Sequence, residues 1–171
     1  MTTLFTQAAG YFDELQWLAS VDERRGVIQT TYNTAQAAFN GYLHVYEKRR
    51  QLIFYTLYPQ HVERPRLQAA VEFITRANYG LVNGNFEIHW ENGGVRFKTS
   101  LSLGRADLQT PLLRPLLLGN VVTHFRYSPG LRALIDTDCT AAEALALVED
   151  PPPDAPPDAP PDMPTETLPM D

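Results

Sequence analysis

The spacing of hydrophobic residues at the start of the chain is typical of an amphipathic helix. These residues follow one another at three- and four-residue steps: Phe5, Ala8, Ala9, Phe12 and Leu15. Residues at such steps lie on one face of an α-helix. The pattern therefore predicts a helix over residues 4–19, with Thr3 or Thr6 as its N-terminal cap.

From residue 26 onward the hydrophobic period changes to two, which is typical of β-strands. Three segments are rich in β-branched and aromatic residues: GVIQTTYN (26–33), AAFNGYLHVYE (37–47) and QLIFYTLY (51–58). Such residues are favoured in strands, and the third segment is apolar enough for a central strand. The sequence EKRR joins the last two segments as a turn.

The EKRR turn sets the pairing of the two strands around it. Pairing Glu47 with Arg50 places Val45 opposite Leu52, on one face of the hairpin. The other face carries Tyr42, His44 and Tyr46 beside Ile53, Tyr55 and Leu57. That face is more apolar than a freely solvated sheet face usually is. Two interpretations remain open: another element of the chain covers it, or it binds a partner through Tyr42, Tyr46, Ile53, Tyr55 and Leu57.

A second helix and a second hairpin follow. Pro65 is suited to a first helical turn, and the periodic residues behind it end at Gly80, a helix stop signal. Strands are then expected over 85–91 and 95–103, joined by the turn sequence ENGG. A loop at Asn92-Gly93 sets Trp90 opposite Val95. A loop one residue further on sets Trp90 opposite Phe97, and both registers pair apolar with apolar residues.

The C-terminal part of the folded region is expected to be helical. A helix starts near Thr110, contains Pro115, and is interrupted by SPG at residues 128–130. The segments LRALI and AAEALALVE then form short closing helices. The predicted order is α-β-β-β-α-β-β-α with hairpins, which indicates an antiparallel α+β domain flanked by helices.

Charge divides the chain into a body and a tail. Residues 1–149 carry 14 acidic and 14 basic residues, whereas residues 150–171 carry six acids, nine prolines and no Lys or Arg. Such a tail cannot bury enough apolar surface to fold, so we expect 150–171 to be a disordered, acidic, proline-rich segment. The neutral body gives no overall electrostatic case for nucleic acid. Binding through three Arg-rich turns, Arg24-Arg25, EKRR and Arg64/Arg66, remains an alternative.

The sequence contains no recognisable catalytic, cofactor or metal motif. A helix ends at Gly80 where a phosphate-binding loop would need one to begin, so the glycines of residues 78–97 are expected to shape turns. The single cysteine, Cys139, and four widely spaced histidines form no known ligand pattern. We expect no cofactor and no enzymatic activity, with an unrecognised hydrolase as a minor alternative. The absence of a signal peptide or a membrane span predicts a cytoplasmic protein.

One segment resembles a known protein family. The sequence RPRLQAAVEFITRANYGLVNGNFEIHWENGGVRFKTSLSL, residues 64–103, is similar to the bacterial YbjN family. It shares a helix with an N-Y-G-type stop, a G-N-F strand entry, a glycine turn and an R(F/Y)-x-T-S strand. Weaker similarity extends over 4–58 and 110–135, which places a YbjN-like domain at 1–149.

The resemblance implies a fold and a class of function. The fold would be that of type III secretion chaperones, a twisted antiparallel sheet flanked by helices and usually dimeric. The family is assigned to sensory-transduction regulation, without enzymatic activity and without catalytic residues to transfer. The expected function is therefore that of a chaperone-like or regulatory homodimer that binds other proteins.

Overall fold

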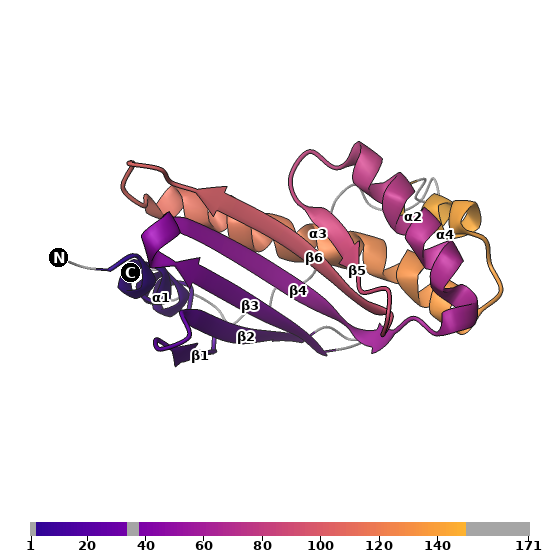
Figure 1. Cartoon of the computed structure of the whole chain (residues 1–171), viewed down its shortest axis with the longest axis horizontal. Coiled ribbons are helices and arrows are strands. Elements are labelled where there is room, and N and C mark those ends of the chain that lie inside the picture. Colours follow the sequence, from indigo (N-terminus) through magenta and orange to yellow (C-terminus); the bar gives the residue numbers. More distant parts are fainter. Residues whose placement is uncertain (1–2, 34–37, 150–171) are drawn as a thin grey trace, which may run out of the picture.

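The computed structural model describes residues 3–33 and 38–149. Six antiparallel strands form one sheet in the order β1-β2-β3-β4-β6-β5. Helix α3 runs behind this sheet, and α2 and α4 lie together at one end of it (Figure 1). The strands are β1 (Ala19–Asp22), β2 (Val27–Asn33), β3 (Ala38–Tyr46), β4 (Gln51–His61), β5 (Asn85–Ile88) and β6 (Gly94–Ser102). The helices are α1 (Leu4–Glu14), α2 (Leu67–Gly80), α3 (Thr110–Asp136) and α4 (Ala141–Glu149). The predicted tail, 150–171, lies outside the described residues.

The first helix begins as expected and ends early. Thr3 is the N-terminal cap, and its side-chain oxygen accepts a hydrogen bond from the Thr6 N–H at 3.0 Å. The helix stops at Glu14 because Gln16 adopts a left-handed conformation with φ +54°. This turn directs the chain into β1, a four-residue edge strand that the hydrophobic pattern did not predict.

The predicted β3–β4 register is confirmed. Leu43 lies opposite Phe54, and Val45 lies opposite Leu52. The turn between the strands is one 3₁₀ turn, Glu47–Arg49, and Arg50 closes it in the left-handed conformation. All four paired residues are buried on the face that the helices cover.

Both predicted β5–β6 registers are wrong. Ile88 lies opposite Val95, so β5 ends at Ile88 and a five-residue loop, 89–93, replaces the two-residue turn. The loop is longer because Gly93 docks against the end of β4, where the Val62 N–H donates to the Gly93 carbonyl at 2.9 Å. A Cβ on Gly93 would lie 1.9 Å from the Val62 carbonyl oxygen, so the docking requires glycine.

The predicted interruption of the last long helix at SPG is also wrong, because α3 continues through Pro115 and Pro129. A proline within a helix costs about 3 kcal/mol. The buried face of α3 extends beyond both prolines and offsets that cost, with Leu117 on one side of SPG and Leu134 on the other. Gly130 allows α4 to approach closely, since a Cβ there would lie 2.7 Å from the Ala144 carbonyl oxygen.

The core lies between the sheet and the helices in two clusters. The first joins α1 and the first half of α3 to β2, β3 and β4 through residues such as Phe12, Phe54 and Leu117. The second joins α2, α4 and the rest of α3 to the β5–β6 hairpin through residues such as Phe73, Phe97 and Leu131. Both clusters use the same face of the sheet, which leaves the opposite face outside the core.

Candidate functional site

The five predicted partner-binding residues lie together on the sheet face opposite the helices. Tyr42 and Tyr46 are on β3, and Ile53, Tyr55 and Leu57 are on β4. None of them belongs to either core cluster. We call this surface the outer face, and its residues are Gln29, Tyr42, His44, Tyr46, Ile53, Tyr55, Leu57, Glu87, Arg96 and Lys98.

Strand register arranges the outer face in rows across the sheet. Tyr42 pairs with Gln29 on one side and with Tyr55 on the other. Tyr55 pairs in turn with Lys98 on β6. His44 and Ile53 form a parallel row beside this one. The aromatic residues are thus adjacent because neighbouring strands place them opposite one another.

The outer face is only partly accessible, although no described helix covers it. Tyr46 is 39% exposed and Leu57 is 36% exposed. Tyr42, Ile53 and Tyr55 are half-buried. Side-by-side packing of large residues explains this burial. Rigid aromatic residues of this kind are favoured at protein interfaces because little entropy is lost on binding.

Ring contacts link the aromatic residues of the outer face. The His44 ring stacks on Tyr46 with centroids 6.3 Å apart and meets Tyr55 edge-on at 5.6 Å. The guanidinium carbon of Arg96 lies 4.2 Å from the centre of the Tyr55 ring, a cation–π geometry. Burial, with a smaller effect from the Arg96 charge, lowers the pKa of His44. His44 therefore presents a neutral ring at pH 7.

Three charged residues on β5 and β6 border the aromatic residues of the outer face. Glu87 forms ion pairs with Arg96, at 2.7 Å, and with Lys98. Burial tends to raise the pKa of the Glu87 carboxyl, but hydrogen bonds from Lys98 and Arg96 outweigh it and hold that pKa below its usual range. Glu87 lies opposite Arg96 in the sheet, so register brings the acid beside its bases. Glu91, in the 89–93 loop, pairs with Arg64 at 3.8 Å.

A hollow of about 560 Å³ continues the outer face where β4 separates from β6. Its lining residues are Leu57, Tyr58, His61, Glu87, Ile88, His89, Asn92, Gly94, Val95 and Arg96. Leu57, Glu87 and Arg96 belong to both the hollow and the outer face. The aromatic surface therefore ends in a depression.

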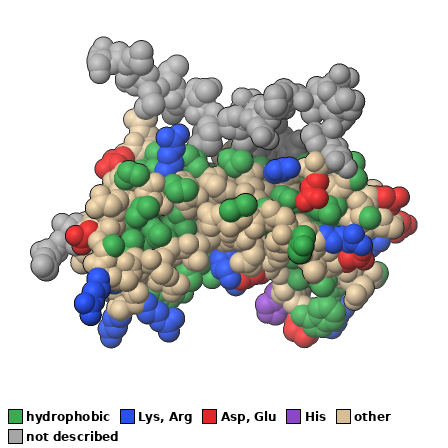
Figure 2. Space-filling view, turned by 90° about the horizontal axis from the view of Figure 1, so that it is seen from above, with side chains coloured by type: hydrophobic (Ala, Val, Ile, Leu, Met, Phe, Trp, Pro, Cys, Tyr) green, Lys and Arg blue, Asp and Glu red, His purple; other side chains and the backbone are tan. Residues whose placement is uncertain are grey.

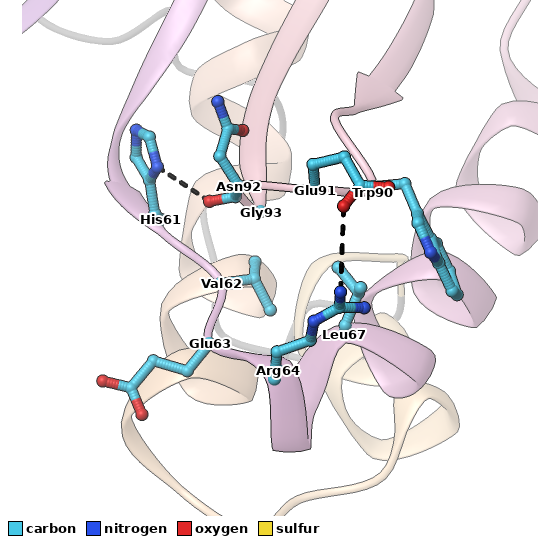
Figure 3. A pocket seen from close by; sticks show the side chains of 9 residues that line it. All are labelled: His61, Val62, Glu63, Arg64, Leu67, Trp90, Glu91, Asn92 and Gly93. Atoms are coloured by element: carbon cyan, nitrogen blue, oxygen red, sulfur yellow. Dashed lines mark hydrogen bonds and ion pairs between the residues drawn. The ribbon is translucent and has the colours of Figure 1, made fainter.

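A second hollow, of about 250 Å³, lies between the end of β4 and the 89–93 loop (Figure 3). Two links cross it: the His61 Nδ1 contacts the Asn92 carbonyl at 2.8 Å, and Arg64 pairs with Glu91 (Figure 3). These contacts attach the loop to the start of α2. The loop that the glycines shape is thus held by backbone and side-chain links.

The Arg-rich turns do not form one patch. The β1–β2 and β3–β4 turns adjoin, since the Val45 N–H donates to the Gly26 carbonyl at 2.7 Å. Lys and Arg side chains gather at the lower left of Figure 2, toward the end of the molecule where α1 lies in Figure 1. Arg64 and Arg66 lie beyond the opposite end of β4, where Arg66 donates to the Leu134 carbonyl at 2.8 Å.

The remaining candidate groups stay apart. In residues 3–33 and 38–149, no three His, Cys, Asp or Glu side chains are grouped so as to hold a metal ion. Cys139 is a free, half-buried thiol. Nor does any helix in those two ranges have the length and apolar character to cross a membrane.

Sequence reasoning missed two buried polar residues on α3, Asn120 and His124. Asn120 Oδ1 accepts from the Thr56 hydroxyl at 2.7 Å, and its Nδ2 donates to the Phe54 carbonyl at 3.1 Å. His124 is fully buried. Both lie at helical spacing on the apolar stripe that includes Leu117 and Leu131. That spacing was the signal that could have identified them.

Comparison with known proteins supports the fold. No family model matches the sequence, and a search of curated proteins found no match. The crystal structure of YbjN, a candidate transcription regulator from E. coli, aligns with a TM-score of 0.54 at 7% identity, over 72% of this chain and 86% of that one. A structure of the HopA1–SchA chaperone–effector complex aligns with a TM-score of 0.47 at 15% identity, over 69% of this chain and 88% of that one. The protein therefore has a YbjN-like α+β fold, as the resemblance in its sequence implied.

Proposed function

We propose that this protein is a cytoplasmic, non-enzymatic protein-binding module with a chaperone-like or regulatory role, and that it acts as a homodimer. The observation that carries the proposal is the outer face, an aromatic surface that belongs to neither core cluster. Tyr42, Tyr46, Ile53, Tyr55 and Leu57 are the proposed contact residues. Nucleic acid is the less favoured partner, because only two of the three Arg-rich turns adjoin and the third lies beyond the other end of β4.

The physical argument rests on the chemistry of the outer face. Tyrosine combines a large apolar ring with a polar hydroxyl, so it binds protein surfaces while remaining compatible with water in the free state. The ion-paired Glu87, Arg96 and Lys98 form a polar border beside the rings. An apolar centre with a polar rim is the usual organisation of a protein interface.

A photo-crosslinking amino acid placed at Tyr55 tests the contact surface in living cells of the source organism. The matched control carries the same group at Val122, an exposed residue of α3 on the helical side of the molecule. The proposal predicts protein adducts from position 55 and few from position 122. Equal yields at the two positions, or adducts from position 122 alone, would contradict it.

The homodimer is tested by light scattering on the full chain at micromolar concentration. The proposal predicts a particle with twice the mass of one chain. A monomer at that concentration would refute the dimer but leave the binding of other proteins open to the crosslinking test. An adduct at position 55 with the mass of two chains would assign the outer face to the dimer itself.

A further inference from the structure

Helix α3 is apolar on two sides, although only one side packs on the sheet. The packed side includes Leu113, Leu117 and Leu131. The opposite side is a row of residues at three- and four-residue steps that belongs to neither core cluster: Pro111, Pro115, Leu118, Val122, Arg126 and Pro129. We call this row the α3 stripe. Leu118 is half-buried and the other five are exposed. A helix that is apolar all round is normally covered on both sides, so the α3 stripe is suited to a further contact.

The charges on α3 have one sign over almost its whole length. Residues 110–135 contain Arg114, Arg126 and Arg132, all exposed, and no Asp or Glu. Arg132 forms an ion pair with Asp136 at 4.0 Å. Arg114 and Arg126 have no ion-pair partner within the described residues. The complement of such a surface is an extended apolar segment that carries acidic residues.

The direction of α4 leads the chain toward the α3 stripe. Ala144 lies against Gly130, where a Cβ would meet the Ala144 carbonyl oxygen at 2.7 Å. One turn further along α4, the Val148 carbonyl accepts a hydrogen bond from Arg126 Nε at 3.4 Å. Because residues later in α4 lie beside residues earlier in α3, the two helices run antiparallel. A chain that continues beyond Glu149 in the direction of α4 therefore passes along the first half of α3.

The residues that follow Glu149 match this surface in charge and in length. Residues 150–171 contain six acids, nine prolines and no Lys or Arg. An acid recurs at every fourth position: Asp150, Asp154, Asp158, Asp162 and Glu166. Polyproline II rises about 3.1 Å per residue, so about six residues span the roughly 18 Å of helix between Arg126 and Arg114. Such a segment cannot form a core of its own, but its preformed extended shape binds apolar surfaces at low entropic cost.

We propose that residues 150–171 bind along the α3 stripe of their own chain, with acids beside Arg126 and Arg114 and prolines on the apolar residues between them. Covalent attachment holds the two parts at an effective concentration of about a millimolar, so weak contacts suffice. A second copy of the stripe is unsuited to this place, because it would bring arginines against arginines. The contact lies on the helical side of the molecule. It is therefore independent of the protein binding proposed for the outer face.

A photo-crosslinking amino acid at Val122 of the full purified chain tests the contact. The proposal predicts a product with the mass of one chain, in which position 122 is joined to residues 150–171. Cleavage after Glu149 by a glutamate-specific protease, followed by mass spectrometry, identifies the joined fragments. The same group at Tyr79, which is 96% exposed on α2, is the control and should give at least fivefold less of this product. In about 1 M sodium chloride the yield from position 122 should fall at least threefold, because salt screens exposed charges.

Charge reversal on both sides of the contact tests its ionic part. Arg114→Glu should reduce the crosslink from position 122 at least threefold. Asp154→Lys together with Asp158→Lys should reduce it equally, and these two changes alter no residue of the folded body. All three changes combined should restore at least half of the original yield. Arg24→Glu makes the same charge change as Arg114→Glu on the exposed β1–β2 turn and should leave the yield unchanged.

Three results would overturn the inference. The first is an equal yield of the tail product from positions 122 and 79. The second is a yield from position 122 that neither salt nor charge reversal changes. The third is a product from position 122 with the mass of two chains, which would assign the α3 stripe to a second copy. Failure of the proposed protein-binding function is distinguishable, because position 55 would then give no partner adduct while position 122 still joined the tail.

Discussion

Asn120 fastens α3 to the middle of the sheet. Its side chain bonds to Thr56 and Phe54 of β4, and to the Thr99 hydroxyl of β6 at 3.1 Å. Asn120, Thr56 and Thr99 are each almost fully buried. Water cannot replace these bonds, so each group left unpaired would cost about 1–3 kcal/mol.

Replacing Asn120 with alanine should therefore reduce the free energy of unfolding by about 2 kcal/mol or more, because the buried Thr56 hydroxyl loses its acceptor and the missing side chain leaves a void between α3 and the sheet. Urea denaturation at pH 7 measures the change. Val122→Ala is the control on the same helix, since Val122 is exposed and should shift stability by less than about 0.5 kcal/mol. A loss below about 1 kcal/mol for Asn120→Ala would mean that the bonds contribute little.

His124 makes stability depend on pH. Its ring lies among Phe39, Tyr58, Phe86 and Phe125, and no described group bonds to either ring nitrogen. Burial lowers the pKa of His124 from 6.5 to about 3. The folded-state pKa lies below the unfolded one, so its contribution to stability is complete above pH 6.5 and is lost as pH falls toward 3.

The free energy of unfolding should accordingly fall by up to about 1.4 kcal/mol per pH unit between pH 6 and pH 4.5. Urea denaturation across this range measures the slope. Tyr58 is the titratable neighbour of the ring, and it stays neutral there because burial raises its pKa. His124→Leu, which removes both unpaired nitrogens, should lack most of this slope. Equal slopes in the two proteins would disprove the role assigned to His124.

At the scale of elements, close packing of α3 against α4 depends on Gly130. A Cβ there would lie 2.7 Å from the Ala144 carbonyl oxygen and 2.8 Å from the Phe73 ring, whereas a Cβ at Gly119 meets no atom within 4 Å. Gly130→Ala should lower the free energy of unfolding by about 1–3 kcal/mol through overpacking. Gly119→Ala should raise it by about 0.5–1 kcal/mol through helix propensity. Thermal unfolding of both variants checks the opposite signs, and the same sign in both would contradict the packing argument.

The sequence was sufficient to predict most helices and strands and the residues of the outer face, because both follow from local patterns. The EKRR turn determined how β3 and β4 pair, and that register places Tyr42 beside Tyr55. The β5–β6 register was not predictable in this way, since it depends on Gly93 docking against Val62, a residue far away in the sequence. The continuity of α3 through Pro129 depends likewise on tertiary burial, which outweighs local propensity.

At the scale of the whole molecule, the helices concentrate on one side of the sheet and the aromatic outer face remains on the other. The comparison with YbjN supports this architecture as a known fold. Fold alone does not determine function, so the proposal depends on the side chains of the outer face.

The most direct test of the central claim is hydroxyl-radical footprinting of tyrosines, in living cells and on dilute purified protein. The proposal predicts that Tyr42 and Tyr55 are oxidised much less in cells than in dilute solution, because a bound protein covers the outer face. Tyr79, which is almost fully exposed on α2, is the internal control and should react equally in both samples. Equal oxidation of Tyr42 and Tyr55 in the two samples would contradict a protein-binding role for the outer face.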